Sequence, residues 1–271
     1  MDTITRTRVH EQLMELKLKH AEKTVDQLCQ EATERQSSYT EFLSRVLDEE
    51  LVRRRDRGTH LRIQLAHFPF QKTLEQFDFG FQPAIDQRQV EELATLSFMA
   101  QGGNVVLLGP PGVGKTHLAV GLGLKACLAG SSVYFISAHE LARRLLASLA
   151  DDSIDARLFE FAKYKLLIID EMGYLPYDRQ QATLLFQLIA RRYEHVPTII
   201  TTNKSFGQWA EIFGGDAAVA SAILDRLLHH ATVINIRGAS YRLKDRQPTL
   251  GLAGEEAAGG KSSKKGGEST R

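Results

Sequence analysis

Apolar residues recur at roughly helical spacing through the first 65 residues, with charged residues between them. This stretch contains no proline, and its one glycine is Gly58. Ser38 is followed three residues later by Glu41, just before an apolar pair, which is the pattern of a capping box at a helix start. The pattern therefore predicts a small all-helical N-terminal domain over residues 1–65.

The pattern changes over residues 66–84, where five phenylalanines accompany Pro69, Gly80 and Pro83. We predict an extended linker that is laid over the following domain. Aromatic side chains at this density favour packing against that domain rather than stacking on nucleic-acid bases. One or two of the phenylalanines are candidates for lining a base pocket.

From Asn104 onward, short runs rich in Val, Ile and Leu alternate with helical stretches. Such alternation is typical of an α/β fold with a mainly parallel sheet covered by helices on both faces. We assign residues 85–248 to this domain. The five predicted strands are Val105–Gly109, Ser132–Ser137, Leu166–Asp170, Thr198–Asn203 and Thr232–Ile236.

Composition adds limits rather than a function. The apolar fraction is 43% and the charged fraction 25%, as in ordinary globular proteins. No apolar run approaches the ~20 residues of a membrane span, and we see no signal peptide. The two cysteines suggest neither a disulfide framework nor a zinc site. We therefore expect a cytoplasmic protein without a membrane partner. The net charge of +1 neither requires nor excludes nucleic acid. Residues 249–271, rich in Gly, Ser and Lys, are predicted to be disordered.

The segment GPPGVGKT has the spacing of a phosphate-binding P-loop, and it lies between an apolar run and a helical stretch. Glycines allow the backbone N–H groups to turn toward phosphate oxygens, and a helix N-terminus adds partial positive charge. We expect Lys115 to reach the β- and γ-phosphates of ATP and the Thr116 hydroxyl to ligate Mg²⁺. The predicted nucleotide-binding residues here are Gly109, Pro110, Pro111, Gly112, Val113, Gly114, Lys115, Thr116 and His117.

Two further polar positions follow buried strands. The run LLIIDE ends in Asp170 and Glu171, which parallel strands would place beside the P-loop. We predict that Asp170 holds Mg²⁺ through water and that Glu171 polarises the attacking water. Asn203, at the end of IITTN, is expected to orient that water. The alternatives are a strand ending in exposed acids and an asparagine that serves only as a helix N-cap or turn residue.

This combination of motifs resembles the AAA+ superfamily, in which ATP lies between neighbouring subunits and an arginine from one subunit contacts the γ-phosphate held by the next. The resemblance makes Arg226 the candidate for this arginine, since a guanidinium is always charged and binds phosphate oxygens in pairs. An ion pair of Arg226 with Asp225 or Glu211 is the alternative. Arg242 is a candidate sensor arginine, although it could equally contact nucleic acid or only solvent.

A narrower resemblance covers nearly the whole chain except the tail. The run GPPGVGKTHLA resembles the DnaC/DnaA-related initiator branch, while residues 170–194, residues 201–244 and the helical region ending in LVRRRDR resemble the IstB-like transposition helper ATPases of insertion sequences. One departure is Met172, where leucine is expected. The resemblance implies ATP-dependent oligomerisation on double-stranded DNA with little sequence preference, as a ring or spiral that recruits and stimulates a transposase.

A nonspecific DNA-binding protein needs Lys and Arg against phosphates. One candidate cluster, near the end of the helical domain, is Arg53, Arg54, Arg55 and Arg57. A second is Arg143 and Arg144, in the region after the second strand that faces the DNA channel of initiator-type relatives. A solvated helix face is the alternative for both clusters. Arg191 and Arg192 are expected to be solvated or to contact another subunit.

Three other functions use the same nucleotide motifs. A helicase loader of the DnaC kind would bind a replicative helicase and single-stranded DNA. A small-molecule kinase would need an acceptor pocket and a lid, of which the sequence shows no sign. A binding module would use ATP for assembly without useful turnover. The helical N-terminal region and the SYRLK segment favour the transposition helper.

Overall fold

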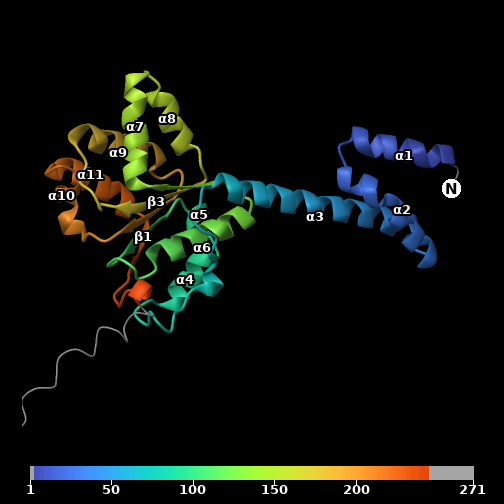
Figure 1. Ribbon diagram of the computed structural model, residues 1–271, viewed down its shortest axis with the longest axis horizontal. Helices are drawn as coiled ribbons and strands as arrows, with labels where there is room; N and C mark the ends of the chain where they lie inside the picture. Colours follow the sequence, from blue (N-terminus) through green and yellow to red (C-terminus); the bar gives the residue numbers. More distant parts are fainter. Residues whose placement is uncertain (1–2, 244–271) are drawn as a thin grey trace, which may run out of the picture.

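The body of the protein is a parallel five-stranded sheet between two layers of helices, as Figure 1 shows. The computed structural model describes residues 3–243, so the predicted tail and the last residues of the predicted 85–248 domain lie outside the described residues. The strand order is β2-β3-β4-β1-β5. The strands are β1 (Asn104–Leu108), β2 (Val133–Ser137), β3 (Leu166–Met172), β4 (Thr198–Thr202) and β5 (Ala231–Asn235). All five predicted strands are present, with ends shifted by at most two residues, and the predicted α/β fold is confirmed.

Strand β3 explains why the sheet must be covered on both faces. Leu166 and Ile168 belong to one core cluster, whereas Leu167 and Ile169 belong to another, and none of the four is exposed. Because neighbouring side chains of a strand point to opposite faces, a continuous apolar run needs two covering layers. One layer contains α4 (Gln87–Ala94), α5 (Ser97–Ala100) and α6 (Lys115–Leu128). The other contains α7 (Ala138–Ala150), α8 (Ile154–Ala162), α9 (Arg179–Arg192), α10 (Trp209–Ile212) and α11 (Ala217–Leu228).

The N-terminal helices form an arm that projects from this body (Figure 1). It consists of α1 (Thr3–Glu15), α2 (Lys19–Glu34) and the long α3 (Tyr39–Leu65). The predicted capping box forms at Ser38, where α3 begins. At the far end, Ala21, Leu28 and Val46 make a small core between α2 and α3. At the near end Ala66 packs into the core of the body, and its carbonyl accepts a hydrogen bond from the Phe135 amide at 2.8 Å. Since the chain passes directly from α3 into the core of the body, the boundary of the helical domain at residue 65 remains a proposal.

The linker after α3 lies against α6 and includes a short 3₁₀ helix, Leu74–Gln76. Leu74 and Phe77 are buried in the core cluster of the body. The His117 ring packs edge-on against Phe77, and its Nε2 lies 2.8 Å from the Thr73 carbonyl. The linker is thereby attached directly to the helix that follows the P-loop.

Arg192, expected on a solvated or subunit-contact face, is instead only 2% exposed. Helix α8 ends beneath it, and the last carbonyls of a helix have no partner within that helix. The guanidinium supplies the missing donors, and burial lowers its pKa to about 9. Its hydrogen-bond acceptors are the carbonyls of Phe161, Ala162, Tyr164 and Pro197 and the Thr198 hydroxyl. Neighbouring Arg191 is exposed and pairs with Asp155.

Within residues 3–243, no helix combines the length and the apolar character needed to cross a membrane.

Candidate functional site: the P-loop and the carboxyl edge of the sheet

The P-loop connects β1 to α6 and depends on glycine at two close approaches. At Gly112, which has φ +82°, an added Cβ would lie 2.0 Å from the Ser240 Oγ. At Gly114, with φ +98°, it would lie 2.6 Å from a ring carbon of Phe77. Both positions therefore exclude a side chain for steric as well as conformational reasons. The loop is enclosed by the linker on one side and by the segment after β5 on the other.

Lys115 and Thr116 begin α6 and point toward the same space. The Lys115 Nζ donates to the carbonyls of Gly109 and Pro110, at 2.7 Å each. Burial lowers the pKa of Lys115, and the negative charge of Asp170 partly opposes that shift. The Thr116 hydroxyl lies 3.0 and 3.2 Å from the two carboxylate oxygens of Asp170. The P-loop and the tip of β3 are therefore in direct contact, as expected from the sequence.

The two acids at the end of β3 have very different surroundings. Asp170 is 7% exposed, and burial raises its pKa although the hydroxyls of Thr201 and Thr116 donate to it. Glu171 is exposed and has φ +60° at a register shift between β3 and β4. A β-bulge of this kind reorients the side chain that it carries. The shift gives Glu171 access to the cavity described below.

Thr201 on β4 joins these two acids and was not singled out from the sequence. It is fully buried, its hydroxyl donates to Asp170 at 2.5 Å, and the same oxygen accepts the Glu171 amide at 2.9 Å. Thr202 instead donates to the Met172 carbonyl at 2.8 Å. The only sequence signal was a pair of threonines at the end of an apolar strand. Which of the two faces the acids depends on the register between β3 and β4.

A cavity of about 290 Å³ collects most of the predicted residues. Its wall contains the P-loop from Pro111 to His117, together with Glu171, Asn203 and Arg242. Asn203 follows β4 and is exposed, as is Arg242 in the 3₁₀ helix Tyr241–Leu243. Phe70 and Phe77 of the linker also line this space.

Gln82 is the second residue that sequence reasoning missed. It lines the cavity and is 1% exposed, and its Nε2 donates to the Ala239 carbonyl at 2.8 Å. Its Oε1 is buried and has no hydrogen-bond partner among the described residues. Buried acceptors are rarely left unpaired, because losing hydration without compensation costs about 1–3 kcal/mol. Through the Nε2 bond, Gln82 joins the linker to the segment after β5 beside the cavity.

Three groups of predicted residues lie elsewhere. Arg226 is not part of the cavity wall: it lies over the Phe186 ring at 4.8 Å and donates to the Ala222 carbonyl. Glu211, a suggested partner of Arg226, pairs with Lys204 instead. Arg143 and Arg144 lie on α7, and both pair with Glu140. Exposed positions on α3 carry Arg53, Arg54, Arg55 and Arg57.

Comparison with known proteins agrees with this geometry. A family model described as IstB-like ATP binding protein matches residues 11–249. The chain belongs to this family. It is 45% identical over 240 residues to an insertion sequence IS5376 ATP-binding protein of Geobacillus stearothermophilus, covering 89% of this chain and 95% of the relative. It is 47% identical over 235 residues to an insertion sequence IS21 ATP-binding protein of Pseudomonas aeruginosa, covering 87% and 88%.

A solved structure of AMPPCP-bound DnaA from Aquifex aeolicus supports the fold. It superimposes with a TM-score of 0.53 at 20% identity, over 70% of this chain and 58% of that one. At this identity the likeness speaks for the α/β fold alone. The narrower resemblance seen in the sequence, to IstB-like proteins, is confirmed by the family match.

Proposed function

We propose that the protein binds ATP with Mg²⁺ and hydrolyses it at the carboxyl edge of its sheet. The observation that carries this proposal is the convergence of Lys115, Thr116, Glu171 and Asn203 on one cavity, with Asp170 hydrogen-bonded to Thr116. Family membership and the ATP-binding proteins of insertion sequences named above support it.

Each residue has a chemical role that follows from its position. Lys115, held at the P-loop, neutralises phosphate charge. Thr116 and Asp170 supply the oxygen ligands that suit Mg²⁺, which when bound offsets charge on the phosphates. Glu171 is exposed, and among the described residues no hydrogen bond to its carboxylate competes with water. It therefore accepts a proton from water. Asn203 orients that water through its amide.

We further propose that the protein assembles through its ATP sites on duplex DNA and recruits the transposase of its insertion sequence. The relatives belong to insertion sequences, which supports a role in transposition. Arg226 lies outside the cavity of its own chain, which suits a contact with the nucleotide of a neighbouring subunit. The arginines of α3 are exposed and can reach phosphates. We propose phosphate contacts by Arg143 and Arg144 as well, in exchange for their pairs with Glu140, and a sensor role for Arg242.

The deciding experiment is native mass spectrometry of the purified protein with duplex DNA, single-stranded DNA or none, in ATP, ADP or no nucleotide. We expect a large assembly only with ATP and duplex DNA together. We also expect slow ATP hydrolysis that duplex DNA or the transposase accelerates. A preference for single strands would favour a helicase loader instead, and a monomer or dimer under every condition would contradict the trans role of Arg226.

A further inference from the structure

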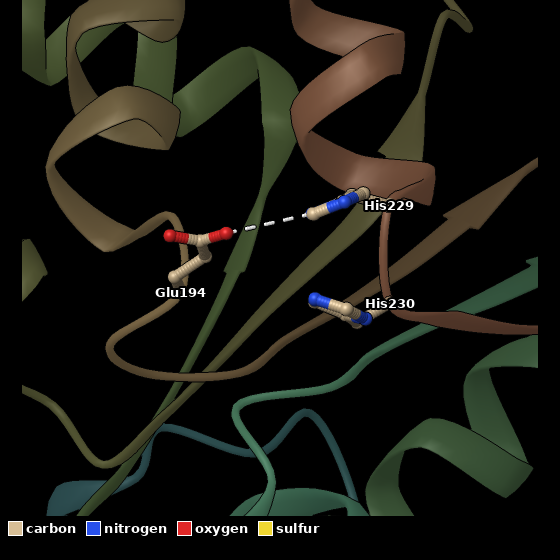
Figure 2. A group of neighbouring side chains, drawn as sticks. All are labelled: Glu194, His229 and His230. Carbon is tan, nitrogen blue, oxygen red and sulfur yellow. Dashed lines mark ion pairs between the residues drawn. The ribbon is translucent and has the colours of Figure 1, made fainter.

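Two imidazoles and one carboxylate meet on a face of the body where two helices end (Figure 2). Glu194 follows α9, His229 ends α11, and His230 lies between α11 and β5. One potential ligand atom from each of the three lies within 4.8 Å of the other two. Among residues 3–243 this is the one group of three such side chains brought so close.

The backbone holds all three positions in place. The His230 carbonyl accepts the Asn104 amide at 2.9 Å, which fixes the start of β5 beside β1. Glu194 has φ +57°, the left-handed conformation that turns the chain sharply after α9. Its carbonyl lies so close to Gly102 that a Cβ there would approach within 3.3 Å. Because the backbone is already ordered, binding through these side chains requires only that their rotamers be fixed.

The electrostatic surroundings favour a cation. The carboxyl ends of α9 and α11 both point to this place, and each helix end carries partial negative charge. The Glu194 carboxylate adds a full charge, 3.5 Å from the His229 Nδ1. The rings of His229 and His230 lie only 4.1 Å apart between centroids, so the two imidazoles share one place on the surface. Neutral imidazole is the form that binds metal ions.

We propose that Glu194, His229 and His230 form a binding site for a zinc-like divalent cation. Two nitrogen ligands and one carboxylate suit Zn²⁺, whereas Mg²⁺ and Ca²⁺ prefer oxygen ligands alone. The side chains of His229 and Glu194 are 49% and 52% exposed, so water can complete the coordination and the ion can exchange. This inference goes beyond the proposed ATPase function and does not depend on it.

Such an ion would connect the ends of two helices around Arg226. Arg226 lies one turn before His229 on α11, and its guanidinium packs on Phe186 of α9 and, at 5.9 Å, on Tyr193. The Tyr193 hydroxyl is 2.8 Å from the His229 Nδ1. A cation joining Glu194 to His229 and His230 would therefore stabilise the α9–α11 contact that positions Arg226.

The test is direct metal binding to the untagged full-length protein, stripped with EDTA and kept without nucleotide. Equilibrium dialysis with Zn²⁺ measures stoichiometry and affinity, and the visible absorption of Co²⁺ reports a low-symmetry nitrogen-containing site. Variants His229→Ala, His230→Ala and Glu194→Gln each remove one ligand, and His195→Ala is the control because His195 is exposed nearby but outside the group. Melting temperatures without metal verify that every variant is folded.

We expect one Zn²⁺ for each wild-type and His195→Ala chain. Each ligand variant should bind at least about tenfold more weakly, since even the loss of an outer hydrogen-bond partner of a metal ligand costs about 10–100-fold. Zn²⁺ should also raise the melting temperature of the wild type but not of the ligand variants. Equal Zn²⁺ affinity in wild type and all three ligand variants would overturn the proposal, as would a wild-type chain that binds no Zn²⁺.

Discussion

The nucleotide site and the helical arm each contain one buried acid, and the pKa values of the two acids are shifted in opposite directions. In the arm, Glu50 is 5% exposed and accepts the amides of His20 and Ala21, at 2.8 and 3.1 Å. Burial alone would raise its pKa, but these hydrogen bonds together with the charges of Arg54 and His20 outweigh burial, and the net pKa is lowered. In the site, Asp170 is 7% exposed but lies deeper in the protein, and burial raises its pKa although Thr201 and Thr116 donate hydrogen bonds to it.

The difference separates a structural acid from one that awaits a ligand. Glu50 completes the first turn of α2, where backbone amides lack partners within the helix. Asp170 receives the hydroxyls of Thr201 and Thr116 and the Glu171 backbone, yet burial still raises its pKa, so its charge remains incompletely compensated. A bound cation would supply the missing positive charge. Without it, the uncompensated carboxylate makes the folded state less stable. Substitutions at five positions test this difference, and the one with the largest expected effect comes first.

The largest effect is expected from Lys115→Ala, which removes the cation of the P-loop. Binding of ATP, and with it any ATP-dependent assembly on DNA, should fall below detection, because the other lysine of the described cavity wall, Lys72, belongs to the linker and not to the P-loop. Titration with a fluorescent ATP analogue measures this. Lys72→Ala is the matched control, and comparable losses in both variants would mean that the P-loop lysine is not special.

Glu171→Gln preserves shape but removes the carboxylate that is placed to accept a proton. We expect ATP binding to persist while kcat falls by about 10²–10⁴-fold, the range for loss of a general base. Complexes with duplex DNA should become long-lived, which gel-shift dissociation rates can follow. Normal hydrolysis by this variant would show that another group serves as the base.

Arg192→Leu tests the core rather than the site. Four carbonyls lose a buried donor, so the free energy of unfolding should fall by about 3 kcal/mol or more. Arg191→Leu is the control next to it and should cost less than about 1 kcal/mol, as for other exposed ion pairs. Urea denaturation followed by circular dichroism compares the two. Similar losses would contradict the structural role of Arg192.

Thr201→Val removes the hydroxyl between Asp170 and the Glu171 amide while keeping the volume. We expect kcat to fall by about 10–100-fold with a raised Mg²⁺ requirement, in line with the loss of a partner that orients a metal ligand. Thr201→Ser should restore most activity. Thr202→Val is the control, because its hydroxyl bonds the Met172 carbonyl instead. Equal effects at both positions would argue for general damage to β4.

Glu50→Ala should have the smallest effect, about 1–2 kcal/mol on the arm, with ATP hydrolysis unchanged. Since the pKa of Glu50 is lowered in the folded state, its contribution is present above the unfolded value of about 4.3 and is lost as pH falls through the folded value. Hydrogen exchange of α2 amides at neutral and acidic pH measures this. Asp48→Ala, at an exposed position whose hydrogen bond is to Ser44 of the same helix, should leave the exchange rates unchanged.

Much of the site could be predicted because the P-loop is local. Gly109 to Thr116 is one continuous segment, and the strand before it and the helix after it are also consecutive in the sequence. Asp170 and Asn203 could be added because parallel strands bring their carboxyl ends to one edge. Thr201 and Gln82 could not be found in this way. Their importance depends on the register between β3 and β4 and on the position of the linker over the cavity.

Periodicity and contiguous motifs were enough to predict the α/β class, the strands, the capping box at Ser38 and the family. Which charged side chains are buried, and which partners they have, became clear only from the tertiary structure. It buried Arg192 over the end of α8, left Arg191 exposed, and gathered Glu194, His229 and His230 from two helix ends. The physical reason is that burial and partners of a charge are set by segments distant in sequence, which local pattern does not specify.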